Sequence, residues 1–315
     1  KRSLPWRVGK KSPKKLYYRL LSEFMLQQTQ VKTVIPYFYN FTKKFKTLKA
    51  LSKSNETEIL KMWEGLGYYR RARNLLACSK ILVKGYNSKL PYSINEIKKL
   101  PGVGDYTANA LLGLIYNEPR IALDGNVKRL FSRNLNKNEN KINFERFIEK
   151  NNKRLFTTNR NDDFVEALME FGALICKPRD PNCLECCLKK TCKYFKSSRK
   201  VKSIKKKMMK KKNFDIFCYI NNKKQIALTK NNRISFLKNF NVPEIREVSS
   251  FPKNQNWKFL KNYKKSISNL KLNINLYYKF SNKIPPMYNW YSLTRNKEFV
   301  PSFTKKIFRQ VSSLF

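Results

Sequence analysis

Apolar side chains recur at helical spacing through the first two thirds of the chain. Leu16, Leu20 and Phe24 lie about one helical turn apart, with Leu21 and Met25 beside them. This period predicts an amphipathic helix over residues 16–30, with Glu23 inside it. Further helical patterns cover residues 36–45, 72–84, 143–156 and 163–175. We therefore predict a mainly α-helical first domain.

The pattern changes to that of strands after residue 213. Apolar and aromatic runs at residues 214–220, 225–229 and 270–280 are typical of a sheet, and the last alternates through Leu270, Leu272, Ile274 and Tyr277. Residues 199–212 precede them and hold nine basic side chains. This basic segment is predicted to be a solvated linker that can lie along phosphates, so the domain boundary falls there.

The composition limits the binding partners and the acid–base chemistry that the chain can have. The 315 residues carry a net charge of +47, which favours a polyanion such as nucleic acid, although a codon bias toward A and T would also enrich lysine. The chain has no histidine, so acid–base work falls to carboxylates, tyrosine, lysine or cysteine. No apolar run reaches the length of a membrane span and no signal peptide is recognised, so we expect a soluble cytoplasmic protein.

A glycine turn precedes the most distinctive helical segment. Gly102, Val103 and Gly104 lead into an apolar run, and backbone N–H groups at such a helix N-terminus bind anions, here a nucleic-acid phosphate. Twenty residues after Gly104, Asp124 ends a second apolar run and is a candidate catalytic carboxylate. An ordinary turn before a core helix is the alternative interpretation of the glycines alone.

Four cysteines are packed within 17 residues, spaced as Cys176-x6-Cys183-x2-Cys186-x5-Cys192. Thiolates at this density indicate a zinc site or an iron–sulfur cluster rather than disulfides. The two-plus-two spacing of zinc ribbons is absent. Cys187 is adjacent to Cys186, and spacing favours Cys186 as the ligand.

These motifs together resemble a known superfamily. The segment LPGVG followed by LDGNV resembles the helix-hairpin-helix and catalytic aspartate of base-excision DNA glycosylases, and SEFMLQQTQV resembles the segment that carries the catalytic glutamate of the adenine DNA glycosylases, the MutY family. The cysteine spacing resembles the four-iron, four-sulfur (4Fe-4S) loop of this superfamily.

The resemblance implies a fold. Residues 1–198 would form a mainly α helix-hairpin-helix glycosylase domain with an iron-sulfur loop at residues 176–192. Residues 199–212 would be the basic linker, and residues 213–315 a smaller α+β Nudix-like domain for lesion recognition. The glutamate-rich Nudix box is absent, and four acidic residues from 213 onward could not build its metal site. We therefore exclude pyrophosphatase activity.

The resemblance also implies an activity: hydrolysis of the N-glycosidic bond of adenine mispaired with 8-oxoguanine or guanine, after the base is flipped out of the duplex. Glu23 would protonate adenine and then activate water, while Asp124 would stabilise or trap the sugar. Tyr106 stands where endonuclease III-type homologues carry a Schiff-base lysine, so the enzyme should be monofunctional. Tyr106 and Asn126 would hold the catalytic groups in place.

Binding roles follow from the same resemblance. The positions that match the adenine pocket are Trp6, Arg7, Leu26, Val31 and Glu166. Gln28 and Tyr68 match residues that intercalate at the lesion, and Gly102, Val103 and Gly104 would contact the DNA backbone. Ser281, in Phe280-Ser281-Asn282, matches the loop that reads 8-oxoguanine, with Asn282 in place of the family histidine.

The expected cofactor is one 4Fe-4S cluster on Cys176, Cys183, Cys186 and Cys192. The expected partner is double-stranded DNA containing A:8-oxoG or A:G mispairs, bound by a monomer in the bacterial cytoplasm at the nucleoid, with no membrane involved. Three alternatives stay open: an endonuclease III-like enzyme for oxidised pyrimidines, a non-catalytic iron-sulfur DNA-binding protein, and a zinc-bound structural module.

Overall fold

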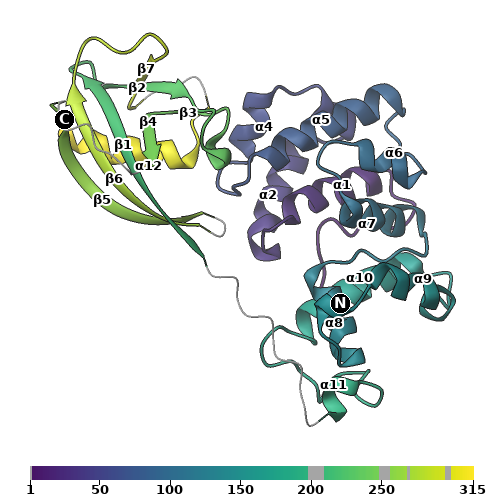
Figure 1. Cartoon of the computed structure of the whole chain (residues 1–315). Coiled ribbons are helices and arrows are strands. Elements are labelled where there is room, and N and C mark those ends of the chain that lie inside the picture. The colour runs from purple at the N-terminus through teal and green to yellow at the C-terminus, as the bar shows by residue number, and fades with distance from the viewer. Residues whose placement is uncertain (1, 198–208, 248–255, 268–269, 295–298) are drawn as a thin grey trace. The chain divides into compact units, whose positions relative to one another are not determined.

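The computed structural model of the chain describes residues 2–197, 209–247, 256–267, 270–294 and 299–315. The chain divides into two compact units, Lys1–Ile204 and Lys205–Phe315 (Figure 1). The first unit is helical and the second contains a sheet, which confirms the predicted order of a mainly α domain and a smaller α+β domain. In the part of the chain that is described, no helix is both long and apolar enough to cross a bilayer.

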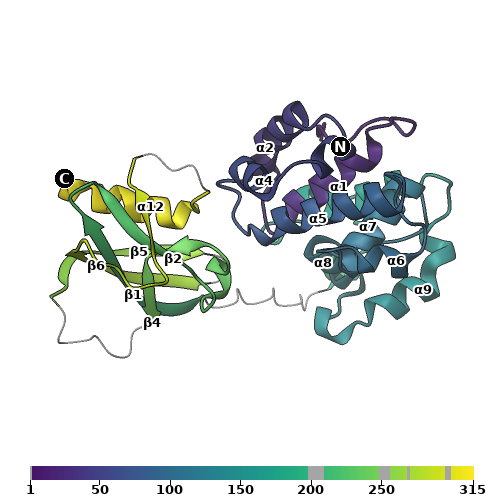
Figure 2. The ribbon, with the colours of Figure 1, turned by 90° about the horizontal axis from the view of Figure 1, so that it is seen from above.

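The first unit begins with seven helices. They are α1 (Lys15–Leu26), α2 (Val31–Lys44), α3 (Leu48–Ser52), α4 (Glu56–Met62), α5 (Arg70–Gly85), α6 (Ile94–Lys99) and α7 (Asp105–Tyr116). Helix α1 is their centre, because it is buried almost continuously from Tyr17 to Met25 and packs against α2, α5 and α7 (Figure 2). A polar side chain on α1 is therefore placed inside the protein.

Helix α1 ends at Leu26, four residues before the predicted end. The guanidinium of Arg71, from α5, donates hydrogen bonds to the carbonyl oxygens of Phe24 at 3.2 Å and Met25 at 2.7 Å. The last turn of α1 is therefore capped by a side chain. Gln28 then adopts a left-handed conformation with φ of 58°, which no helix interior accepts. The predicted helix over residues 16–30 was too long, and residues 27–30 form a partly exposed turn instead.

The glycine turn between α6 and α7 has the predicted form of a hairpin. Gly102 has a φ of +78°, and a Cβ atom there would lie 2.6 Å from Nδ2 of Asn74 and 2.9 Å from Cε1 of Phe24. Glycine is required on both grounds. Gly104 is the N-cap of α7, so the turn leads directly into the helix.

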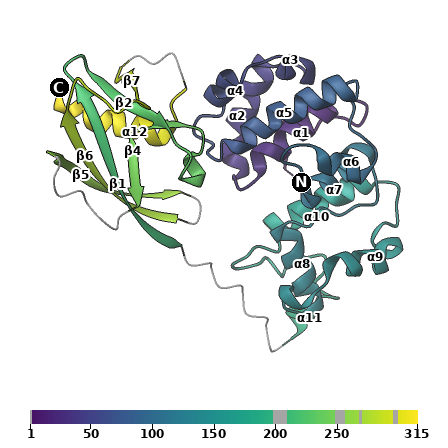
Figure 3. The ribbon, with the colours of Figure 1, turned by 45° about the horizontal axis from the view of Figure 1, so that its top comes forward.

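Four more α-helices lie in the described part of the first unit: α8 (Gly125–Leu135), α9 (Phe144–Leu155), α10 (Asn161–Leu174) and α11 (Lys193–Lys196). Helix α10 packs on both α7 and α8, and α11 packs on α8 (Figure 3). A small apolar core joins α7 and α10 and holds the chain that leads into α8. Its buried members are Ala110, Leu114, Ala122 and Val165.

Over its described residues, the second unit is a mixed sheet with one α-helix. Its strands are β1 (Lys210–Asn221), β2 (Gln225–Lys230), β3 (Asn241–Val242), β4 (Glu244–Glu247), β5 (Lys258–Ile267), β6 (Leu270–Phe280) and β7 (Asn289–Ser292). The order is β3-β2-β1-β6-β5, with β4 paired to β1 and β7 to β2; β1 and β6 are parallel and the other pairs antiparallel. Helix α12 (Ser302–Val311) lies along the sheet (Figure 1), and its Phe303 contacts Phe236 of the short 3-10 helix Ser235–Leu237.

Two sequence predictions need correction here. Strand β1 begins at Lys210, inside the predicted linker, because residues 210–212 pair in register with residues 270–272 of β6. Residues 199–208 of that linker lie outside the described residues. On β6 the buried residue after Ile274 is Leu276, whereas Tyr277 faces the other way and stacks on Phe217 with ring centroids 5.4 Å apart.

Candidate active site

Glu23 is a buried carboxyl in the middle of α1, with 6% of its surface exposed. Burial raises its pKa to about 7, while the charge of Arg19 and a hydrogen bond with Tyr106 lower it and the charge of Asp124 raises it. Desolvation is the largest of these effects because the charged form loses its hydration. Glu23 can therefore hold a proton near neutral pH.

Tyr106 lies near both candidate carboxylates. It is the second residue of α7, and its side chain is hydrogen-bonded to Glu23. Burial, together with the nearby charges of Glu23 and Asp124, raises the pKa of Tyr106 well above its ordinary value. The phenol therefore stays neutral and can donate a hydrogen bond at any working pH.

Asp124 occupies the N-cap of α8, an environment unlike that of Glu23. Its Oδ1 accepts from the backbone N–H of Val127 at 2.7 Å, and its Oδ2 accepts from Nδ2 of Asn126 at 2.8 Å. Both oxygens thus have donors, and the positive end of the helix dipole adds to them. This arrangement suits an ionised carboxylate.

Two arginines of α8 connect this helix to the cysteine loop. Nη2 of Arg129 donates to Oδ1 of Asn126 at 2.9 Å, and Nε of Arg129 donates to the carbonyl of Cys176 at 2.9 Å. Arg133 donates to the carbonyls of residues 177 and 178 at 2.6 and 2.9 Å. The side chain that orients Asp124 is therefore itself held against the loop.

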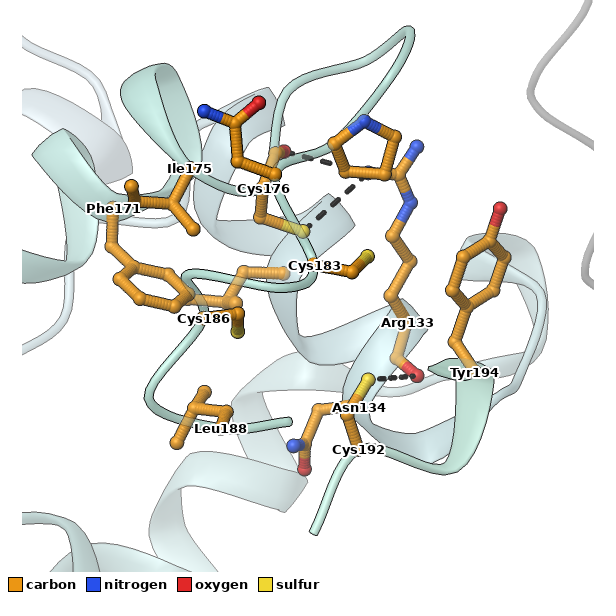
Figure 4. A pocket seen from close by; sticks show the side chains of 13 residues that line it. Arg133, Asn134, Phe171, Ile175, Cys176, Cys183, Cys186, Leu188, Cys192 and Tyr194 are labelled. Atoms are coloured by element: carbon orange, nitrogen blue, oxygen red, sulfur yellow. Dashed lines mark hydrogen bonds between the residues drawn. The ribbon is translucent and has the colours of Figure 1, made fainter. Parts of the chain in front are cut away.

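The four cysteines of the predicted cluster line one cavity (Figure 4). Its remaining wall is largely apolar and includes Leu130, Phe171, Ile175, Leu188 and Tyr194. Cys187 is exposed and does not line it, which agrees with the preference for Cys186. Among the described residues, no three side chains that could ligate metal converge on the position of a single ion.

The residues predicted for the adenine pocket are brought together in part. Glu166, on α10, pairs with Arg7 through Oε2 and Nε at 3.2 Å, and also with Arg19. Trp6 is buried against Phe38 of α2, with ring centroids 5.4 Å apart. The last two, Leu26 and Val31, border the turn between α1 and α2.

The two predicted wedge residues share a scaffold. Gln28 and Tyr68 are exposed and have positive φ angles of 58° and 50°. Arg71 joins their loops, because it donates to the carbonyl of Gln27 and, at 3.1 Å, to that of Gly67, while its guanidinium lies 5.4 Å from the Tyr68 ring. The two loops are thus held next to each other.

The predicted backbone contacts of the hairpin need one correction. The N–H of Val103 donates to the carbonyl of Leu100 at 3.1 Å, and the Val103 side chain is buried. Val103 therefore offers neither group freely. Gly104 is exposed at the start of α7, and Gly102 is exposed at the turn.

Ser281 follows β6 in the second unit. Its N–H donates to the carbonyl of Ile220 at 2.9 Å, and its hydroxyl both donates to the Lys283 carbonyl at 2.6 Å and accepts from the Lys283 N–H at 3.2 Å. Asn282 beside it is exposed. The serine is held in a tight turn at the end of a strand.

Sequence reasoning missed three arginines that organise the site: Arg19, Arg71 and Arg129. Arg19 precedes Glu23 by four residues and Arg129 follows Asn126 by three, spacings that place each pair on one helix face. That signal was available. Arg71 caps another helix at a distance in sequence, and no local pattern predicts such a contact.

Comparison with known proteins agrees with this geometry. Residues 21–154 match the family model described as "HhH-GPD superfamily base excision DNA repair protein". A solved structure of a thermostable thymine-DNA glycosylase superposes with a TM-score of 0.55 at 28% identity, covering 62% of this chain and 89% of that one. The helical unit is thus that of a helix-hairpin-helix DNA glycosylase.

Closer relatives specify the family. The chain is 37% identical to the adenine DNA glycosylase of Buchnera aphidicola subsp. Baizongia pistaciae, over 93% of this chain and 87% of the relative. It is 34% identical to that of Buchnera aphidicola subsp. Acyrthosiphon pisum, over 90% and 80%. The chain belongs to the adenine DNA glycosylase family.

Proposed function

We propose that this chain is a monofunctional base-excision-repair glycosylase that hydrolyses the N-glycosidic bond of adenine mispaired with 8-oxoguanine or guanine in double-stranded DNA. Family membership supports adenine excision. The observation that carries the mechanism is the pair of carboxyl groups, Glu23 with a pKa raised to about 7 by burial and Asp124 at a helix N-cap with two donors. Two such environments separate an acid from a stabilising anion.

The two groups answer the two difficulties of the reaction. Adenine leaves poorly as an anion, so Glu23 protonates it; the sugar becomes an oxocarbenium-like cation, so Asp124 stabilises or covalently traps it. Glu23, having lost its proton, then accepts one from the attacking water. Tyr106 and Asn126 hold the two carboxyl groups in position through the hydrogen bonds described above.

The target adenine has to leave the base stack to reach Glu23. Gln28 and Tyr68, exposed on loops that Arg71 joins, are the proposed intercalating wedges. Gly102 and Gly104 approach the phosphates at the hairpin, with the limit noted for Val103. The proposed pocket for the flipped base comprises Trp6, Arg7, Leu26, Val31 and Glu166.

The absence of a lyase step rests on Tyr106. A phenol cannot form the Schiff base that an amine at this position would form with the sugar. Borohydride should therefore trap little covalent complex, and strand breaks should require added base or heat. Tyr106→Lys should create some trapping. Efficient trapping and cleavage by the unmodified protein would favour the endonuclease III-like alternative.

The cysteine cavity fits the proposed 4Fe-4S cluster. The four thiols that line it are the ligand set that such a cluster takes. Nη1 of Arg133 lies 3.5 Å from Sγ of Cys176 and would face the negative charge of bound thiolates. The cluster would tie the loop together and dock it on DNA, since hydrolysis needs no electrons.

Iron content tests this part of the proposal. Purified protein should contain about four irons per chain and absorb visible light. Zinc in place of iron, with no visible absorption, would support the zinc-bound alternative.

The second unit is proposed to recognise the base opposite adenine. Ser281, fixed at the end of β6, is the candidate contact for 8-oxoguanine. We further propose that the protein acts as a monomer on the bacterial nucleoid.

Single-turnover excision tests the proposed function. Duplexes with adenine opposite 8-oxoguanine, guanine or cytosine should be processed in that order of rate, and equilibrium binding should be measured in parallel. Adenine retained in all three duplexes, with binding intact, would point to the non-catalytic alternative.

A further inference from the structure

Arg19 is a buried arginine in the site, and the two-carboxylate mechanism gives it no role. It lies on α1 four residues before Glu23 and is 7% exposed. Its Nη2 pairs with Oε1 of Glu166, and its Nε is buried without a hydrogen-bond partner in the described structure. Burial of a cation is costly unless its charge is used.

The groups that act on Glu23 come from three elements. Arg19 belongs to the same helix, Tyr106 to α7, and Asp124 to the segment that leads into α8. Arg71, from α5, also reaches α1, but its Nη1 donates to carbonyl oxygens at the end of that helix. Arg19 lies four residues before Glu23, a spacing that makes two side chains neighbours on one helix face, and Glu166, on α10, pairs with its guanidinium.

Two opposing effects meet at Glu23. Burial favours the protonated carboxyl, whereas the positive charge of Arg19 favours the carboxylate, and the resulting pKa is about 7. The mechanism asks Glu23 to release a proton to adenine and then to take one from water, so a balance near the working pH serves both steps. Burial alone would hold the proton too firmly for the first step.

We propose that Arg19, held by Glu166, is a positioning residue that sets how readily Glu23 releases and regains its proton. This inference rests on the proposed function of Glu23 as the general acid. It also assigns Glu166 a role in the free enzyme, as the counter-charge that keeps the Arg19 guanidinium beside the acid.

The test is the pH dependence of single-turnover adenine excision in four proteins: the unmodified chain, Arg19→Gln, Arg19→Lys and Lys14→Gln. Removing the Arg19 charge should move the midpoint of the alkaline limb upward by about 1–2 pH units. Arg19→Lys keeps the charge and should stay near the unmodified midpoint. Lys14→Gln removes the same charge from an exposed position of the neighbouring turn and should leave the midpoint in place. An unchanged midpoint in folded Arg19→Gln would overturn the proposal.

A second readout does not depend on activity. The infrared band of the protonated Glu23 carboxyl, identified by its loss in Glu23→Gln, can be titrated in each protein. If the unmodified chain excises no adenine, the proposed function fails, and this titration still decides the role of Arg19: an upward shift in Arg19→Gln supports it and no shift refutes it.

Glu166→Gln covers the case in which Arg19→Gln does not fold. Loss of the counter-charge leaves the charge of Arg19 less compensated, so the Glu23 midpoint should move downward. A midpoint that stays in place would contradict the proposed coupling.

Discussion

The interior of α1 and the start of α8 each supply one carboxyl group to the site, in opposite surroundings. Glu23 is buried within α1, and burial raises its pKa to about 7. Asp124 is half-buried at an N-cap and accepts hydrogen bonds from the Val127 backbone and the Asn126 amide. The same chemical group thus lies in a desolvated position in one place and beside two hydrogen-bond donors in the other.

The two carboxyl groups have opposite effects on the stability of the fold. An N-cap carboxylate stabilises its helix by about 1 kcal/mol. A buried carboxyl with a raised pKa destabilises the fold at any pH where it must ionise. Asp124 therefore stabilises the fold, whereas ionised Glu23 destabilises it. Substitution of the two residues should change the free energy of unfolding differently.

The largest expected effect is on the rate of excision. Glu23→Gln removes the proton donor and Asp124→Asn removes the anion, and each should slow single-turnover adenine excision by about 10³-fold or more, because both interactions strengthen only toward the transition state. Binding to the mispaired duplex should change little. A near-normal rate for Asp124→Asn would refute the assignment of the two roles.

The second largest expected effect is also on the rate of excision, and it concerns the start of α8 alone. At Gly172, on α10, an added Cβ would lie 2.8 Å from both Cβ and the carbonyl oxygen of Asn126, so Gly172→Ala should displace the start of α8. A displacement of about 1 Å costs roughly 100-fold in rate. Gly85→Ala is the matched control, since nothing lies within 4 Å of a Cβ there. Equal rates for the two variants would show that the position of Asn126 is unimportant.

The two carboxyl groups should also differ in their effect on the free energy of unfolding. Replacing Glu23 should stabilise the fold, although it slows the reaction. The pKa of Glu23 is about 7 in the folded state against 4.5 unfolded, so the folded protein binds more protons between these values and loses stability as pH rises through them. The loss is complete above pH 7 and amounts to about 3 kcal/mol. Glu23→Gln should therefore be more stable than the unmodified chain at pH 8 and nearly equal to it at pH 4.

Asp124→Asn is the control for that measurement, because asparagine caps a helix about as well as aspartate. Its unfolding free energy should stay close to that of the unmodified chain at pH 8. Denaturant unfolding at both pH values measures the difference. A Glu23→Gln protein that gains no stability at pH 8 would show that burial does not burden this carboxyl.

The smallest expected effect is on the preference for the opposite base, and it concerns a residue outside α1 and α8. Ser281→Ala removes a hydroxyl of the second unit and leaves both carboxyl groups unchanged, so it should reduce the preference for 8-oxoguanine over guanine by a few-fold and leave the pH dependence of excision as it was. Excision rates opposite the two bases measure this ratio. A shifted pH midpoint in Ser281→Ala would contradict the separation of recognition from chemistry.

The sequence predicted the elements that carry local patterns and failed where the cause is distant. Period and turn chemistry located α1, the hairpin and β6, since side-chain spacing and glycine conformation are local properties. The end of α1 was misplaced because Arg71, 46 residues beyond Met25, supplies the cap. The strand start at Lys210 was missed because pairing with Leu270 of β6 outweighs the charge of the segment.

The residues of the candidate site could be predicted from the sequence, but the surroundings of each residue could not. Glu23 and Asp124 were identified by resemblance, whereas their contrast depends on packing. The hydrogen bond from Tyr106 and the charge of Arg19 are tertiary facts, and they decide how Glu23 titrates.

The pH dependence of single-turnover adenine excision tests the central claim most directly. On a duplex with adenine opposite 8-oxoguanine, the rate should be high below pH 7 and fall about tenfold per pH unit well above it, because Glu23 must carry the proton that adenine receives. The residual rate of Glu23→Gln should lack this limb. A rate for the unmodified chain that is flat or rising between pH 6 and 9 would contradict the assignment of Glu23 as the acid.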